Sequence, residues 1–334
     1  MTTKNRGTAP EALLLSILLA LAFCASPAAH EIDHEPERSH LADSDAVRSL
    51  IQAFRETGDD QYLDTAWHHL QHGLADERPD AVTLVDAATV AQARHDFDLA
   101  QQLIEQALEI NPGYDQAWLL RASIHLLRGE TEEARQACRR LRNASLVAMV
   151  TCSARVQIAG GQYDRALDRL TAVLGAVDRS VEDDAVRAWA LSVAGDAASQ
   201  VDRRSAIRFY TQSLQLNEST QVRAALVDQL IASGQFDAAE ETLEEGHDAL
   251  PLVIRQFVVA RQLGKTDDVS AEIAQADRQF RRWISEADFA HAREMARFYL
   301  DVLVQPELAR ELARVNLELQ REPEDLQLAA RSGV

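Results

Sequence analysis

The sequence predicts an all-α fold, a solenoid of about seven or eight stacked helix–turn–helix repeats. The first observation is a series of small residues at steps of 34, 34, 32, 40 and 33 residues, namely Ala66, Ala100, Ala134, Ala166, Ala206 and Ala239. The second is that apolar residues around them recur three and four apart, which is the period of a helix and not of a strand. A unit of about 34 residues cannot bury its own apolar face, so neighbouring units must stack.

Residues 1–28 have the parts of a Sec-type signal peptide. Lys4 and Arg6 give a basic start, and the apolar run from Leu13 to Ala25 is followed by small residues. Cleavage is expected after Ala28 or Ala29. Two alternatives stay open. The first is an uncleaved membrane anchor, although the run has 13 residues and a bilayer needs about 20. The second is a lipoprotein signal, because Leu21 to Cys24 resembles a lipobox apart from the bulky Phe23.

The charge of the chain limits its partners and suggests its compartment. The full chain carries −19, and loss of the signal leaves about −20, a field that repels phosphate backbones. We therefore expect a protein or peptide partner, no nucleic acid and no membrane insertion after signal removal. Lysine occurs only at Lys4 and Lys265, a skew typical of GC-rich bacterial genomes. Together with the signal, it indicates a periplasmic or secreted protein.

Two cysteines, Cys138 and Cys152, remain after cleavage. They would lie on antiparallel neighbouring helices of successive units, and an oxidising compartment favours a disulfide between them. The alternative is a pair of buried free thiols, which pack well as small apolar groups.

The elements follow in chain order. Residues 29–44 are rich in histidine and acids, with little apolar content, and predict a disordered lead-in. The solenoid is expected over residues 45–334. The helical period begins at Asp45, breaks at Gly58-Asp59-Asp60 and resumes from Leu63 to Leu74.

The next unit carries the clearest pattern. Apolar and small residues mark two helix faces around a turn at His95-Asp96, and Asn111-Pro112 ends the second helix. With Ala81 as repeat position 1, positions 4, 8, 17, 20, 27 and 32 are Leu84, Ala88, Phe97, Ala100, Ala107 and Pro112. This order of residues resembles the tetratricopeptide repeat, in which small side chains let helices approach closely. The resemblance implies a right-handed superhelix.

The resemblance covers residues 45 to about 320. The strings GQYDRA (161–166) and GQFDAA (234–239) are its strongest signals, and the seventh and eighth units are degenerate. Residues 174–184 predict a surface loop, residues 277–288 predict a prolonged helix, and a short helix over Asp325–Ala330 would cap the array. The alternative is an irregular helical bundle.

The repeat positions predict a partner-binding groove on the concave side, formed by first helices. Its candidate residues are Gln116, Leu119, Arg155, Asp228 and Arg261. Arg155 and Arg261 would grip a partner carboxylate; the alternative is that they form ordinary surface ion pairs. The Lys and Asn set of chaperone-binding relatives is lacking.

The sequence contains no motif for a nucleophile, a phosphate loop or a zinc protease, and acid pairs such as Glu132-Glu133 read as solvated helix faces. We therefore expect no enzyme and no cofactor. An envelope enzyme that uses the repeats as a substrate arm would need a further catalytic domain, for which the repeats leave no room.

Histidine is concentrated near the N-terminus. His68 and His72 are four apart, and His30 and His34 lie in the lead-in, so these four could bind nickel, zinc or copper. The leading hypothesis is a non-enzymatic interaction scaffold of the bacterial envelope that binds a partner peptide or helix. The alternative is a periplasmic metal-handling accessory protein.

Overall fold

The computed structural model describes residues 35–178, 182–246 and 249–334, and side chains from Ser44 onward. Over these ranges the chain forms helices α1–α17 with two short irregular helical turns, and no strand. The predicted signal peptide, and the histidines at positions 30 and 34, lie outside the described residues.

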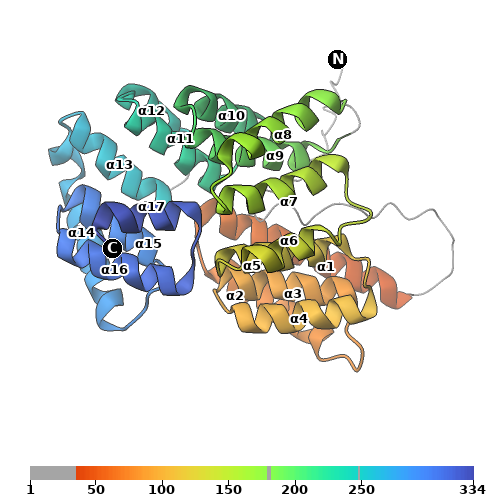
Figure 1. Ribbon diagram of the computed structural model, residues 1–334. Coiled ribbons are helices and arrows are strands. Elements are labelled where there is room, and N and C mark those ends of the chain that lie inside the picture. The colour runs from red at the N-terminus through yellow and green to blue at the C-terminus, as the bar shows by residue number, and fades with distance from the viewer. Residues whose placement is uncertain (1–34, 179–181, 247–248) are drawn as a thin grey trace, which may run out of the picture.

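Consecutive helices form antiparallel pairs that stack along the array (Figure 1). The first four pairs are α1 (Glu35–Thr57) with α2 (Gln61–Leu74), α3 (Ala81–Ala93) with α4 (Phe97–Ile110), α5 (Asp115–Leu127) with α6 (Thr131–Cys138), and α7 (Leu146–Ala159) with α8 (Tyr163–Ala176). Two further pairs are α9 (Asp184–Ser199) with α10 (Arg203–Leu216) and α11 (Thr220–Ala232) with α12 (Phe236–Glu244).

The last pairs are less regular, as the degenerate sequence predicts. In the seventh, α13 (Leu250–Gln262) is followed by a 3₁₀ turn, η2 (Thr266–Val269), and by α14 (Ser270–Ser285). In the eighth, α15 (Ala292–Arg297) continues into a π-helical turn, η3 (Phe298–Val302), before α16 (Pro306–Leu319). Helix α17 (Pro323–Ser332) packs on α16. We call α15, η3, α16 and α17 the C-terminal unit.

The small residues of the predicted period lie where helices meet. All six alanines of that series are fully buried, so each allows the close helix approach that the repeat requires. An all-α helical repeat solenoid is therefore the fold of the described residues, and the irregular bundle is excluded for them.

Local sequence explains the helix boundaries. Asp80 caps α3 by accepting hydrogen bonds from the backbone N–H groups of Val82 and Thr83, at 2.8 and 2.9 Å. Gly161 and Gly234 have φ of 72° and 70° in the turns inside the fourth and sixth pairs, a conformation that favours glycine. His95 takes the same left-handed conformation at the equivalent turn, with φ of 60°.

Three expected irregularities can be compared with the structure. Helix α1 begins at Glu35, ten residues before the expected start at Asp45, so the structure has helix over 35–44 where a lead-in was expected. The acidic start of this segment suits a helix N-terminus, and proline is tolerated in a first turn. Helix α14 reaches Ser285, so the helix predicted around 277–288 is present, and α17 contains the predicted capping helix.

The core divides into two large clusters and a small third one of Leu126, Ala134 and Val156. A long core runs from α1 to α13 through residues such as Val47, Leu120 and Val259. The second core joins α13, α14 and the C-terminal unit. It is aromatic, and the ring centroids of Phe280 and Phe298 lie 5.0 Å apart in an edge-to-face arrangement.

The array closes on itself. The backbone N–H of Arg321, between α16 and α17, donates to the carbonyl oxygen of Leu127 at the end of α5, at 2.8 Å. The Thr220 hydroxyl at the start of α11 donates to the carbonyl oxygen of Glu56 near the end of α1, at 2.9 Å. The C-terminal helices consequently lie next to the end of α5 (Figure 1).

Candidate functional site

The five predicted groove residues lie on first helices of four different pairs. Gln116 is half-buried and Leu119 is buried on α5. Arg155, Asp228 and Arg261 lie on α7, α11 and α13. The three charged residues all contact the C-terminal unit. Repeat positions could not predict these contacts, because the partner residues are distant in sequence.

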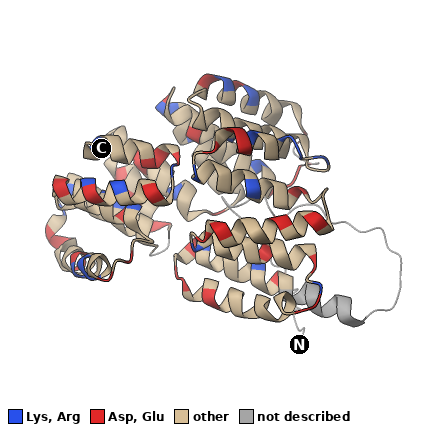
Figure 2. Cartoon of the chain, turned by 60° about the horizontal axis from the view of Figure 1, so that its bottom comes forward, with Lys and Arg blue, Asp and Glu red and all other residues tan. Residues whose placement is uncertain are grey.

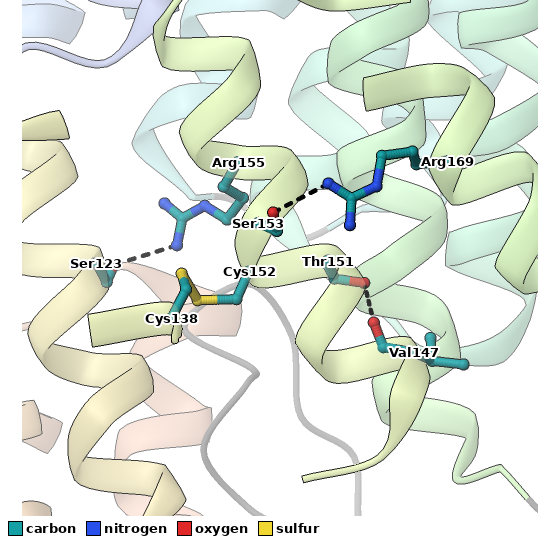
Figure 3. Close-up of a disulfide and its surroundings, with 8 residues drawn as sticks. All are labelled: Ser123, Cys138, Val147, Thr151, Cys152, Ser153, Arg155 and Arg169. Atoms are coloured by element: carbon teal, nitrogen blue, oxygen red, sulfur yellow. Dashed lines mark hydrogen bonds between the residues drawn. A yellow bond between two sulfur atoms is a disulfide. The ribbon is translucent and has the colours of Figure 1, made fainter. Parts of the chain in front are cut away.

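Arg155 contacts two other parts of the array. Its guanidinium donates to the Ser123 hydroxyl on α5 at 3.3 Å (Figure 3). On the other side, a guanidinium nitrogen lies 3.7 Å from a carboxylate oxygen of Glu322, at the N-cap of α17. The expected carboxylate is therefore present, but it belongs to this chain.

Asp228 lies between two guanidinium groups. Arg255 on α13 donates to both carboxylate oxygens, at 3.0 and 2.6 Å, and Arg297 on α15 donates to the same carboxylate, at 2.9 Å to Oδ2. Burial alone raises the pKa of Asp228, but the two neighbouring guanidinium groups outweigh it and hold that pKa below its ordinary value. Asp228 stays ionised and joins the sixth, seventh and eighth pairs.

Arg261 does not grip a carboxylate. It donates to the backbone carbonyl oxygens of Val302 at 3.0 Å and Asp301 at 3.3 Å, at the end of η3. Its role in the structure is to fix the irregular eighth pair against α13.

The inner helices leave little open surface. Every residue of α3 from Thr83 to Gln92 is buried, and most of α9 from Val186 to Ala198 is buried as well. The open concave groove expected from the repeat positions is thus closed in the described structure, because the array curves tightly and the C-terminal unit docks against it.

Charged groups nevertheless gather where the C-terminal unit meets the middle of the array. Arg293 binds Asp325 at 2.6 Å and Glu322 at 2.9 Å. Asp196 on α9 accepts a hydrogen bond from the Tyr210 hydroxyl at 2.8 Å. Burial, and then the nearby charge of Glu324, raise the pKa of Asp196 to about 7. Sequence reasoning missed this cluster, because its members are scattered along the chain.

The predicted histidine pair does not by itself form a complete metal site. His68 and His72 lie on α2 with exposed side chains, and their ring centroids are 6.4 Å apart. Within the described ranges, no group of three or more His, Cys, Asp or Glu side chains could hold a metal ion. The metal assignment therefore remains a prediction.

The structure places Cys138 and Cys152 in a disulfide, with their Cα atoms 5.7 Å apart (Figure 3). It joins the last residue of α6 to the middle of α7, the geometry expected for antiparallel neighbours in successive pairs. The structure thus contains the expected disulfide and not the alternative pair of free thiols.

Beside this disulfide is a cleft that sequence reasoning missed. It has a volume of about 450 Å³ and is lined by α6, α7 and α8. Four of its lining residues are arginines, namely Arg135, Arg139, Arg165 and Arg169. The spacing of four residues within each pair was a readable signal, since i and i+4 side chains share a helix face. Acidic positions are otherwise spread along the whole array (Figure 2).

No helix in the described part of the chain is apolar over a length that would cross a bilayer.

Residues 85–146 match the family model of the tetratricopeptide repeat, and no curated protein matches the chain. Similar solved structures include one from a study of Pseudomonas aeruginosa pilF, with 17% identity over 60% of this chain and 91% of that one, at a TM-score of 0.44. A tetratricopeptide repeat protein from Parabacteroides merdae shares 13% identity over 87% of this chain and 100% of its own, at a TM-score of 0.41.

A third similar structure is the APC/C hetero-tetramer Cut9–Hcn1. Its identity to this chain is 17% and its TM-score 0.45, and the match covers 84% of this chain but only 48% of that one. Residues 85–146 thus match the tetratricopeptide repeat, and they lie within an array of similar helix pairs.

Proposed function

We propose that this protein is a non-enzymatic scaffold of the bacterial envelope, whose repeats hold a helical or peptide segment of a partner protein on the concave side. Tetratricopeptide repeats serve in general as protein–protein interaction scaffolds, so the class of function follows from the family. The partner, the compartment and the surface are our inference.

The observation that carries the choice of surface is that three first helices already bind a protein segment there. Arg155 contacts a carboxylate, Asp228 contacts a guanidinium, and Arg261 contacts backbone carbonyls, all supplied by the C-terminal unit. These internal contacts support the choice of this face, because groups of a protein segment already bind to it. A partner segment with an acidic helix N-terminus and a basic residue would compete for the same contacts.

Competition requires that the C-terminal unit can be displaced. Its contacts with the middle of the array are charged and remain partly accessible, since the side chains of Arg155 and Glu322 are 23% and 31% exposed. An ion pair as long and as exposed as that of Arg155 with Glu322 contributes only about 0–1 kcal/mol. The apolar core that the unit shares with α13 and α14 would remain intact while these contacts exchange.

Site-specific photocrosslinking in cells tests this proposal. A photoreactive amino acid in place of Gln116, which is half-buried on the concave side, should capture a partner. The same amino acid in place of Glu133, exposed on α6, is the matched control. The Glu322→Gln substitution weakens the competing internal contact and should increase capture at position 116.

Equal capture at both positions, or no effect of Glu322→Gln, would contradict binding on the concave side. The envelope assignment has its own test. Cell fractionation followed by N-terminal sequencing should find a periplasmic form that begins at Ala29 or His30. A full-length form in the cytoplasm would contradict it.

A further inference from the structure

The arginine-lined cleft beside the disulfide has the form of a second binding site. It is bounded by the second helices α6 and α8 and floored by α7. Its volume of about 450 Å³ falls within the range typical of sites for small ligands. Arg155, which contacts the C-terminal unit, is not part of the lining, and in Figure 3 it lies on the other side of α7 from Arg169.

The lining of the cleft is strongly basic. It contains four arginines and neither aspartate nor glutamate. Arg135 forms an ion pair with Glu132. Arg169 donates to the Ser153 hydroxyl at 3.2 Å, and Arg165 donates to the Gln162 side-chain oxygen at 3.5 Å.

These two acceptors are neutral, so they leave the arginine charges uncompensated. Among the residues that the structure describes, no ion pair involves Arg139, Arg165 or Arg169. Three cations thus face one cleft on a chain whose net charge is −19.

The cleft is lined along α6, from Thr131 to Arg139, and along the C-terminal half of α7, from Ser153 to Gly160. The disulfide holds the last residue of α6 against α7 (Figure 3), and Cys138 is itself part of the lining of the cleft. The wall that carries Arg135 and Arg139 is thereby fixed relative to the wall that carries Arg165 and Arg169.

We propose that this cleft binds a short acidic segment of a protein partner, with its carboxylates on Arg139, Arg165 and Arg169. Arginine suits carboxylates because its planar donors can form paired, charge-assisted hydrogen bonds. The Gln157 side-chain oxygen, in the same lining, is buried without a hydrogen-bond partner among the described residues, and a peptide N–H supplies a donor, which a fully deprotonated anion such as sulfate lacks.

The surrounding field limits the ligand's length. The chain as a whole carries −19, so a long polyanion would be repelled wherever it extends over acidic parts of the surface. A short acidic segment places its charge only where the arginines are. The site is independent of the proposed concave-side function, because it lies on other residues and needs no movement of the C-terminal unit.

Fluorescence anisotropy with the full mature chain tests the proposal. The probe is a labelled peptide of about eight Glu and Asp residues, and its Gln and Asn counterpart is the neutral control. Arg139→Glu with Arg165→Glu should weaken binding at least about tenfold, since hydrogen bonds to charged groups are each worth about that factor. Arg139→Gln with Arg165→Gln should weaken it in the same direction and covers the case in which the Glu variant does not fold.

A matched double variant excludes a general charge effect. Arg204→Glu with Arg208→Glu makes the same change of charge at exposed positions of α10, outside the cleft lining, and should leave the affinity within about twofold. An equal loss in both double variants would overturn the proposal. So would binding of the neutral peptide, or displacement of the acidic peptide by equimolar inorganic phosphate, which would identify a simple anion site.

Discussion

A single added methyl group should show how tightly the helices of one pair meet. Gly195 on α9 is buried against α10, and a Cβ atom built on it would lie 2.4, 2.6 and 2.9 Å from three ring carbons of Tyr210. Tyr210 is 2% exposed, and its hydroxyl donates to Asp196 at 2.8 Å. The ring therefore cannot move aside without disturbing the packing and this hydrogen bond.

The expected effect of Gly195→Ala has two opposing parts. Alanine favours the helix over glycine by about 1 kcal/mol. Overpacking of a filled site typically costs about 1–3 kcal/mol, and contacts this short on an immobile ring belong at the upper end. We therefore expect Gly195→Ala to destabilise the protein by about 2 kcal/mol. Gly175→Ala in α8 is the matched control, because an added Cβ there meets nothing within 4 Å.

The assay is urea unfolding of both variants beside the parent, followed by circular dichroism. Midpoints are compared only where the slope is unchanged, since repeat arrays can depart from two-state unfolding. Gly175→Ala should raise the midpoint slightly and Gly195→Ala should lower it. If both substitutions stabilise the protein equally, the close approach of α9 and α10 is wrong.

Three further predictions concern the disulfide and the buried charges. Replacing Cys138 and Cys152 by serine should lower the free energy of unfolding in urea by about 3 kcal/mol, the value expected for a loop of about 15 residues, and should weaken binding of the acidic peptide. Unchanged stability, or alkylation of these thiols in the parent protein, would contradict the prediction. Asp196→Asn should become stabilising relative to the parent as pH rises from about 4 to about 7, because the folded parent retains a proton that the unfolded chain releases. The pKa change from 3.8 to about 7 corresponds to an upper limit of about 4 kcal/mol. A stability difference that is independent of pH would contradict this prediction. Asp228→Asn should lower the unfolding free energy by about 3 kcal/mol at pH 7, because two guanidinium groups lose their buried partner, and an unchanged unfolding midpoint would refute that.

Local patterns predicted the fold well because repeat packing is local. Ala100 and Ala134 are fully buried, because successive helices contact each other closely there, as the spacing of these residues predicts. The disulfide was predictable for the same reason, since Cys138 and Cys152 are 14 residues apart, across one inter-helix turn.

The closure of the array was not predictable from such patterns. It depends on contacts such as Arg155 with Glu322, which are remote in sequence and depend on the curvature accumulated over several pairs. The arginine cleft was missed for a different reason. Its signal was present in the i and i+4 arginines of α6 and α8, but the cleft that α6, α7 and α8 form there is visible only in the structure.

An engineered cross-link tests most directly whether the array closes on itself. A Cβ atom at Gly129, in the turn after α5, would lie 4.0 Å from the Cβ of Arg321, within the range of about 3.5–4.5 Å for disulfides. Gly129→Cys with Arg321→Cys should therefore cross-link nearly completely on oxidation. Gly161→Cys with Arg321→Cys, which uses the corresponding left-handed turn one pair further on, should not. Equal cross-linking of the two pairs, or none in either, would contradict the closed array.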